Sequence, residues 1–267
     1  MKKIFNKKRG ELTTQQIVGL IILITSFAVI LFFFFRLNLG ETTDKEICHN
    51  SVVLKGKGTL AKLAAGGGSL DCRTNYVCIS GGGKCEGINP TETKKINLID
   101  SEKPEDIKKN KEAIMEVIAD EMADCWWMFG EGKIDYGGSW DSKLETIVPW
   151  SKYNCAVCSD LKFDKIIQDK IQEINYNEFY IFLNSNKKDD SQTYLKYLYD
   201  SNSFDVVKSK LEVKDKDFKF SKSFLTKERF VIITGMKKGG YIHPYFIESN
   251  KITTKTECGI FDITKAS

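Results

Sequence analysis

An uncharged, apolar run near the N-terminus constrains this chain more than any other feature. It extends from Ile17 to Phe35 and reads IVGLIILITSFAVILFFFF. At a rise of 1.5 Å per residue, such a run forms a helix of about 28 Å, which matches the hydrocarbon thickness of a bilayer. Its hydroxyl-bearing residues, Thr25 and Ser26, are able to bond back to their own helix. We therefore predict a transmembrane helix over residues 17–36.

The flanks of this run predict its orientation. Five basic residues precede it, and the acidic stretch Glu41–Glu46 follows it. Because positive charge stays in the cytoplasm, residues 1–16 are expected there and the rest outside the membrane. A cleaved signal peptide would have a shorter apolar core and an A-x-A-like site, which residues 36–40 do not supply. The expectation is a single-pass cell-membrane protein with the lipid bilayer as one partner.

The net charge of +4 does not extend over the whole chain. Six of the 40 basic residues but one of the 36 acidic residues lie before position 37, which leaves 34 basic and 35 acidic residues beyond it. The exported part therefore has no global attraction to polyanions, and no nucleic-acid partner is expected.

All cysteines follow the apolar run. An even number of cysteines confined to an exported segment predicts disulfides formed in an oxidising compartment. By proximity, we expect the first four to pair among themselves and the later four likewise. The spacings do not match a zinc site, and no metal is expected. The eight residues are Cys48, Cys72, Cys78, Cys85, Cys125, Cys155, Cys158 and Cys258.

The residues just before the apolar run carry a short motif. Lys8-Arg9-Gly10-Glu11-Leu12 places a basic residue, Gly, an acid and an aliphatic residue a few positions ahead of the helix. This arrangement resembles the class III signal of archaeal type IV pilin-like proteins, over about the first 35 residues only. The resemblance implies cleavage between Gly10 and Glu11, and packing of the retained apolar helix into a filament core. Gln15 departs from the Glu that is common in the family, and a plain basic flank is the alternative.

The exported part divides by composition. Residues 37–47 predict a polar stalk, and residues 48–95 a Gly- and Cys-rich module that needs cross-links to hold itself. Within it, Gly81-Gly82-Gly83-Lys84 lacks the spacing of a phosphate-binding loop. Residues 96–267 predict an α+β ectodomain, and the exported part resembles no characterised family beyond a general likeness to uncharacterised archaeal envelope proteins.

A long helix is predicted from about Pro104 to Phe129. Proline suits the first turn, and apolar residues recur at a spacing of 3.6 along one face. Four acids form a stripe at i, i+4 spacing on another face, which suits either a cation or basic partner or, as we favour, a solvated surface relieved by nearby lysines. The stripe comprises Glu112, Glu116, Asp120 and Asp124.

Shorter elements follow. Apolar spacings predict helices around residues 163–171, 179–183 and 194–198. Residues 230–236 and 241–247 alternate as strands around a Lys-Lys-Gly-Gly turn, with Pro244 at an edge position, and residues 257–263 are expected to add a third strand. Helices followed by antiparallel strands give an α+β class.

Cys155-Ala156-Val157-Cys158 is the sharpest candidate for chemistry. A CxxC at a helix start lowers the pKa of its first thiol, and Ser159–Gln168 is the helix that this reading requires. No clear strand precedes it, as a thioredoxin-like enzyme would need, and Cys125 and Cys258 are available as structural partners. Structural disulfides are favoured over a catalytic Cys155–Cys158 pair.

Other catalytic groups are scarce. The chain has two histidines, His49 and His243, and neither lies in a nucleophile motif. The tryptophans are more typical of core and loop packing than of a binding surface. No catalytic residue and no cofactor is predicted. The tryptophans are Trp126, Trp127, Trp140 and Trp150.

Two functional hypotheses result. The favoured one is a membrane-anchored, extracytoplasmic structural or interaction protein that serves adhesion or surface assembly through its helix or an extracellular protein partner. The alternative is a membrane-tethered thiol–disulfide oxidoreductase that uses Cys155 and Cys158.

Overall fold

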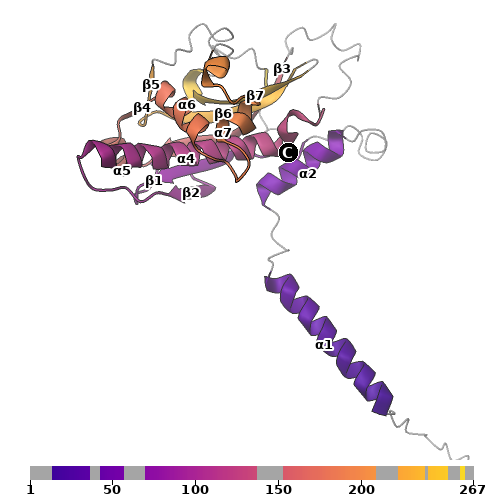
Figure 1. The fold of residues 1–267 in the computed structure, drawn as a ribbon. Coiled ribbons are helices and arrows are strands. Elements are labelled where there is room, and N and C mark those ends of the chain that lie inside the picture. Colours follow the sequence, from indigo (N-terminus) through magenta and orange to yellow (C-terminus); the bar gives the residue numbers. More distant parts are fainter. Residues whose placement is uncertain are drawn as a thin grey trace, which may run out of the picture. The chain divides into compact units, whose positions relative to one another are not determined.

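The computed structural model describes residues 14–36, 43–56, 70–136, 153–208, 222–237, 240–251 and 259–261. The chain divides into two compact units, Met1–Thr43 and Asp44–Ser267. The described part of the first unit is one helix, α1 (Thr14–Arg36), and the second unit holds the sheet and all other helices of the described residues (Figure 1).

Helix α1 is apolar around its whole circumference. Large apolar side chains between Ile17 and Ile30 are 44–65% exposed. The two hydroxyls bond back to the helix as predicted: Thr25 Oγ1 donates to the Ile21 carbonyl at 2.9 Å, and Ser26 Oγ to the Leu23 carbonyl at 2.9 Å. No polar side chain in this stretch therefore needs an external hydrogen-bond partner for its hydroxyl.

The predicted transmembrane helix over residues 17–36 is corrected by the structure. Among the described residues, no helix combines the length and the apolar character that crossing a membrane requires. Spanning takes about 20 consecutive, predominantly apolar residues. The first turn of α1, Thr14-Gln15-Gln16, is polar, so its apolar stretch is shorter than the helix.

The second unit is built around a mixed sheet with strand order β2-β1-β3-β6-β7. Strand β3 pairs in parallel with β1 and, through residues 154–156, with β8, while β6 pairs antiparallel along its other edge. The unit is thus α+β, but its sheet is mixed and not purely antiparallel. Its strands are β1 (Asn75–Ser80), β2 (Glu92–Lys95), β3 (Tyr153–Phe163), β6 (Phe230–Lys237), β7 (Gly240–Glu248) and β8 (Gly259–Phe261).

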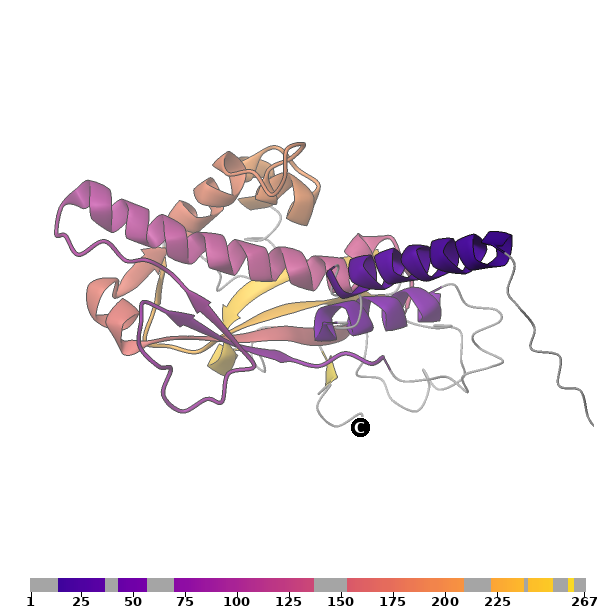
Figure 2. The ribbon, with the colours of Figure 1, turned by 90° about the horizontal axis from the view of Figure 1, so that it is seen from below.

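Helix α4 (Pro104–Met128) runs along the sheet in both views (Figures 1 and 2). It provides the long connection that the parallel strands β1 and β3 require. Its buried face carries Ile114, Ile118, Met122 and Cys125, which confirms the predicted helix and its apolar stripe. The helix ends just before Gly130, which adopts φ +76°, a left-handed conformation that glycine reaches at little cost.

A β-bulge in β3 controls which side chains reach α4. The register with β6 shifts between Val157 and Ser159. In a regular strand consecutive side chains point to opposite faces, but a bulge lets two neighbours face the same way. Cys158 and Ser159 both contact α4 as a result. The helix predicted over Ser159–Gln168 is therefore wrong in its first half, which is strand.

The remaining described elements complete the core. The three predicted short helices are confirmed as α5 (Lys165–Lys170), α6 (Tyr176–Ser185) and α7 (Tyr194–Tyr199). Each begins at a capping residue, Asp164, Asn175 or Thr193, whose side chain accepts a hydrogen bond from a backbone N–H of the helix that follows. The other elements are α2 (Asp44–Gly56), η1 (Gly130–Gly132), β4 (Glu173–Asn175), β5 (Ser223–Leu225), which pairs with β4, and η3 (Ser249–Lys251).

The predicted C-terminal hairpin is confirmed by the antiparallel pairing of β6 and β7. The core beneath it is rich in phenylalanine, and the rings of Phe230 and Phe246 stack at 4.7 Å between centroids. Residues of the predicted Gly- and Cys-rich module, 48–95, contribute α2, β1 and β2 to this same unit.

Candidate functional site

The Cys155-x-x-Cys158 motif lies within strand β3 and not at the start of a helix. Cys158 is bonded to Cys125 of α4, 33 residues away in the chain. Cys155 also takes part in a disulfide, and both cysteines are at most 2% exposed. A redox CxxC needs an accessible first thiol at a helix N-terminus and a second thiol that forms a disulfide with the first. Here Cys155 is buried within a strand, and Cys158 is bonded to Cys125.

The other disulfides join the first part of the second unit. Cys48 pairs with Cys72 and Cys78 pairs with Cys85, at sequence separations of 24 and 7. These pairs and Cys125–Cys158 fall within the two groups expected from proximity. Cys258 lies outside the described residues.

A buried carboxylate, Glu121 of α4, forms the centre of the most elaborate polar cluster in the described residues. Its side chain is 0% exposed. Ser159 Oγ donates to Glu121 Oε2 at 2.9 Å, and Lys45 Nζ of α2 donates to Oε1 at 3.1 Å. A buried carboxylate is tolerated because both of its oxygens accept such bonds.

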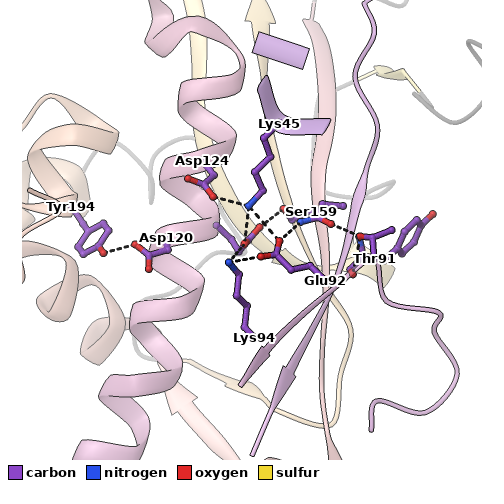
Figure 3. Close-up of polar contacts among 11 residues, drawn as sticks. Lys45, Thr91, Glu92, Lys94, Asp120, Asp124, Ser159 and Tyr194 are labelled. Carbon is purple, nitrogen blue, oxygen red and sulfur yellow. Dashed lines mark hydrogen bonds and ion pairs between the residues drawn. The ribbon is translucent and has the colours of Figure 1, made fainter. Parts of the chain in front are cut away.

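Lys45 connects this carboxylate to further acids (Figure 3). Its ammonium lies 2.6 Å from Asp124 Oδ2 and 3.6 Å from Glu92 Oε2. Asp124 is three residues beyond Glu121 on α4, so one lysine of α2 spans almost a full helical turn. The ammonium is shared by three carboxylates from two different elements.

Strand β2 contributes the other half of the cluster. Lys94 Nζ lies 2.5 Å from Glu92 Oε1 and 3.8 Å from Glu121 Oε1. Asn75 Nδ2 of β1 donates to Glu92 Oε2 at 3.0 Å, and Thr91 donates to the Asn75 side chain. Figure 3 shows the resulting chain of contacts across α2, α4, β1, β2 and β3. We call the residues Lys45, Glu92, Lys94, Glu121, Asp124 and Ser159 the Glu121 network.

The charges of the network shift one another's pKa values. Burial raises the pKa of Glu121, against the opposing effect of Lys45 and Ser159. Burial acts to lower the pKa of Lys45, but Glu121, Asp124 and Glu92 outweigh it and hold that pKa above its usual value. The pKa of Glu92 is lowered: burial opposes this, and the hydrogen bonds from Lys94 and Asn75 outweigh it.

The chemistry open to the network follows from its accessibility. A serine beside a carboxylate and a lysine contains the groups of a proton-transfer site. Ser159, however, is 1% exposed and Glu121 is fully buried. No substrate reaches either oxygen, so the network is suited to holding elements together and not to catalysis.

The network is one of three attachments that hold α2. The others are the Cys48–Cys72 disulfide and the ring of His49, which stacks on Trp127 at 4.1 Å between centroids and contacts the Trp127 carbonyl through Nδ1 at 2.7 Å. An ion-pair network, a covalent bond and an aromatic stack thus all fix the first helix of the second unit. A 13-residue helix is marginal by itself, and these contacts hold it to the folded unit.

The acidic stripe on α4 has hydrogen-bonded partners at two positions, Asp120 and Asp124, and a looser ion pair at Glu112. Tyr194 Oη donates to Asp120 at 2.6 Å, Lys45 pairs with Asp124, and Lys108 lies 3.8 Å from Glu112. Burial and the bond to Asp120 raise the pKa of Tyr194. Within the described ranges, no group of three or more His, Cys, Asp and Glu side chains is arranged to hold a metal ion.

The histidines and two of the tryptophans meet at the C-terminal end of α4. His243 of β7 lies 5.3 Å from Trp126 between ring centroids, and its Nδ1 contacts the Leu198 carbonyl at 2.6 Å. The ring of His49 stacks on that of the neighbouring Trp127. The ring of Trp126 is buried, and the rings of His49, Trp127 and His243 are half-buried. Trp140 and Trp150, like the motif Gly10–Glu11, lie outside the described residues.

The Gly81-Gly82-Gly83 turn has a structural partner in Asp164. Gly83 N donates to Asp164 Oδ2 at 2.6 Å, and Ser80 Oγ donates to the same oxygen at 3.0 Å. The other oxygen of Asp164 caps α5. A Cβ at position 83 would lie 2.9 Å from Oδ2, so glycine permits this close approach.

Sequence reasoning did not identify Lys45, Glu121 or Ser159. One signal was present: Glu121 falls between Ile118 and Cys125 on the apolar face of α4, where an acid requires a buried partner. That partner, Lys45, lies 76 residues away in the chain, and no local pattern indicates it.

Comparison of the chain with protein-family models, with curated proteins and with solved structures finds no match.

Proposed function

We propose that this protein is a non-catalytic structural protein of the cell envelope, exported from the cytoplasm, whose copies assemble through α1. The observation that carries this proposal is the exposure of α1. Its apolar side chains are uncovered on all sides, in a unit separate from the sheet. Burying one such side chain contributes about 1.5–3 kcal/mol, so ten of them represent a large driving force for association.

Other copies of α1 are the occupant that suits this surface. A groove in a partner covers one face of a helix, whereas α1 is apolar around its circumference and buries most area among several like helices. The resemblance of Lys8–Leu12 to a pilin-like signal supports the same arrangement, because cleavage after Gly10 would leave a short polar end before the apolar helix.

The disulfides support an extracytoplasmic location for the second unit. Structural disulfides persist in oxidising compartments and are rare in the reducing cytosol. The triple attachment of α2 also suits an assembly protein. This helix directly follows the first unit in the chain, and its firm attachment would carry load from an assembled α1 into the folded unit.

The test is the oligomeric state of the full chain in a mild detergent, measured by light scattering after size exclusion. We compare the wild type with Leu23→Lys, which adds a charge at a 65%-exposed position in the middle of α1. Gln16→Lys is the matched control, since it adds the same charge within the polar first turn.

The proposal predicts wild-type oligomers that Leu23→Lys dissociates and Gln16→Lys preserves. A monomeric wild type, or oligomers that Leu23→Lys leaves intact, would contradict it. The mass of the mature chain tests processing separately: an N-terminus at Glu11 is expected, and an intact Met1 would reject cleavage.

A further inference from the structure

A cavity of about 370 Å³ lies between α4 and α6, away from the Glu121 network. Its floor is apolar and is formed by Met115 of α4 with Ile181 and Phe182 of α6. Met115 and Phe182 are buried, whereas Ile181 is 50% exposed. The volume lies within the range of sites that bind small molecules.

The rim of the cavity carries charges that are only weakly engaged. Lys108 and Glu112 are one turn apart on α4, and their closest atoms are 3.8 Å apart. By contrast, Lys111 and Glu178 nearby form a pair at 3.1 Å. A separation of 3.8 Å is too long for a hydrogen bond, so the Lys108 ammonium and the Glu112 carboxylate keep their bonding capacity for another partner.

A neutral donor and acceptor completes the rim. Asn177, in the first turn of α6, uses its backbone N–H to bond the Asn175 side chain at 2.8 Å. Its own side-chain amide has no hydrogen bond to any of the described residues. Lys108, Glu112 and the Asn177 amide therefore surround an apolar floor, together with Glu178, whose charge is already paired with Lys111.

We propose that this cavity binds a free amino acid with an aliphatic side chain. The α-carboxylate is recognised by Lys108, the α-ammonium by Glu112, and the side chain packs on Ile181 and Phe182. Charge complementarity selects this class of ligand. A simple anion would pair with Lys108 but be repelled by Glu112, and a simple cation would pair with Glu112 but be repelled by Lys108. An uncharged ligand would pair with neither side chain.

The inference does not rest on assembly through α1, because the cavity lies wholly within the second unit. Its test is a titration of the oxidised full chain with L-leucine, followed by two-dimensional NMR or calorimetry. N-acetyl-L-leucinamide keeps the side chain but lacks both charges, and methyl glucoside offers hydroxyl groups alone.

The variant Lys108→Gln removes the cation at a side chain that is 72% exposed, so it leaves folding intact. Lys165→Gln is the matched control. It removes an equally exposed lysine that also has an acid four residues along its helix, Asp169, but does not line the cavity.

The proposal predicts saturable binding of leucine, an affinity at least about tenfold lower for the uncharged analogue, and a similar loss in Lys108→Gln but not in Lys165→Gln. Three results would overturn it: no saturable leucine binding up to tens of millimolar, equal binding of leucine and its uncharged analogue, or stronger binding of the glucoside.

Discussion

Cys158 and Ser159 are consecutive residues of β3, yet both contact α4. Cys158 is bonded to Cys125, and Ser159 donates to Glu121, which is one helical turn earlier on α4. The β-bulge makes this possible, because it turns two neighbouring side chains to the same face of the sheet. A covalent bond and a buried hydrogen bond therefore attach one point of the strand to adjacent turns of the helix.

Removing the lysine of the Glu121 network should destabilise the fold. In Lys45→Ala the buried Glu121 loses its closest cation, since Lys94 is 3.8 Å away, and we expect a loss of about 2–3 kcal/mol in the free energy of unfolding. Lys165→Ala, which removes an exposed ion pair, should change it by less than about 0.5 kcal/mol. Urea denaturation checks both; equal effects would mean that the network contributes nothing beyond a surface pair.

The raised pKa of Glu121 predicts a pH dependence of stability. The folded protein holds the proton of Glu121 to a higher pH than the unfolded chain, in which the pKa of this group is near 4.5. The stabilising contribution of Glu121 to the free energy of unfolding is therefore present at low pH and is lost as pH rises through the folded pKa. Glu92 has the opposite effect on stability: its pKa is lowered in the folded protein, so its stabilising contribution is present at higher pH and is lost as pH falls through the folded pKa.

Glu121→Gln isolates the first effect, since Gln keeps an acceptor for Ser159 and cannot ionise. The free energy of unfolding of the variant minus that of the wild type should increase as pH is raised from about 4.5. Denaturant titrations at several pH values measure this difference. A difference that stays constant or decreases with pH would contradict the assigned direction.

The disulfides should differ in their contribution to stability. A bond that closes a longer loop removes more entropy from the unfolded chain, and the separations are 33 residues for Cys125–Cys158 and 7 for Cys78–Cys85. Replacing both members by Ala should therefore cost about 1.4 kcal/mol more for the first pair than for the second. Thermal unfolding of the two double variants tests this, and a larger loss for the short loop would contradict it.

Gly132 should be intolerant of a side chain for two separable reasons. Its φ is +69°, and an added Cβ would lie 2.7 Å from the ring of Tyr241. Gly87 has a similar positive φ, +74°, but its Cβ would meet only the end of the flexible Lys162 side chain, at 3.3 Å. Gly132→Ala should thus destabilise by about 1–3 kcal/mol more than Gly87→Ala. Similar losses, measured by denaturation, would show that the Tyr241 ring moves away freely.

Local patterns predicted those elements whose periodicity is regular. The 3.6-residue repeat of α4 and the alternation in β6 and β7 were sufficient to place them. Strand β3 was missed because the bulge at Cys158–Ser159 breaks alternation at the point where a strand would be recognised. The CxxC spacing there indicated a helix start, but both cysteines are explained by structural bonding within the sheet region.

The Glu121 network was beyond local patterns for a different reason. Lys45 lies in a segment interpreted as stalk, and its partners become visible only when α2 is packed against α4. Residues 17–36 show the opposite case. Their helix was predicted correctly, but its role as a transmembrane span is not supported by the length and composition of α1.

The most direct test of assembly is a photo-cross-linking experiment at Leu23. A photoreactive phenylalanine analogue at this position, in the middle of the exposed α1, should yield covalent dimers of the full chain joined between two α1 segments. The same analogue at Lys165, an exposed residue of the second unit, should yield monomers. Fragment masses that link α1 to α1 would support assembly through this helix; monomers alone at position 23, or links to other molecules only, would contradict it.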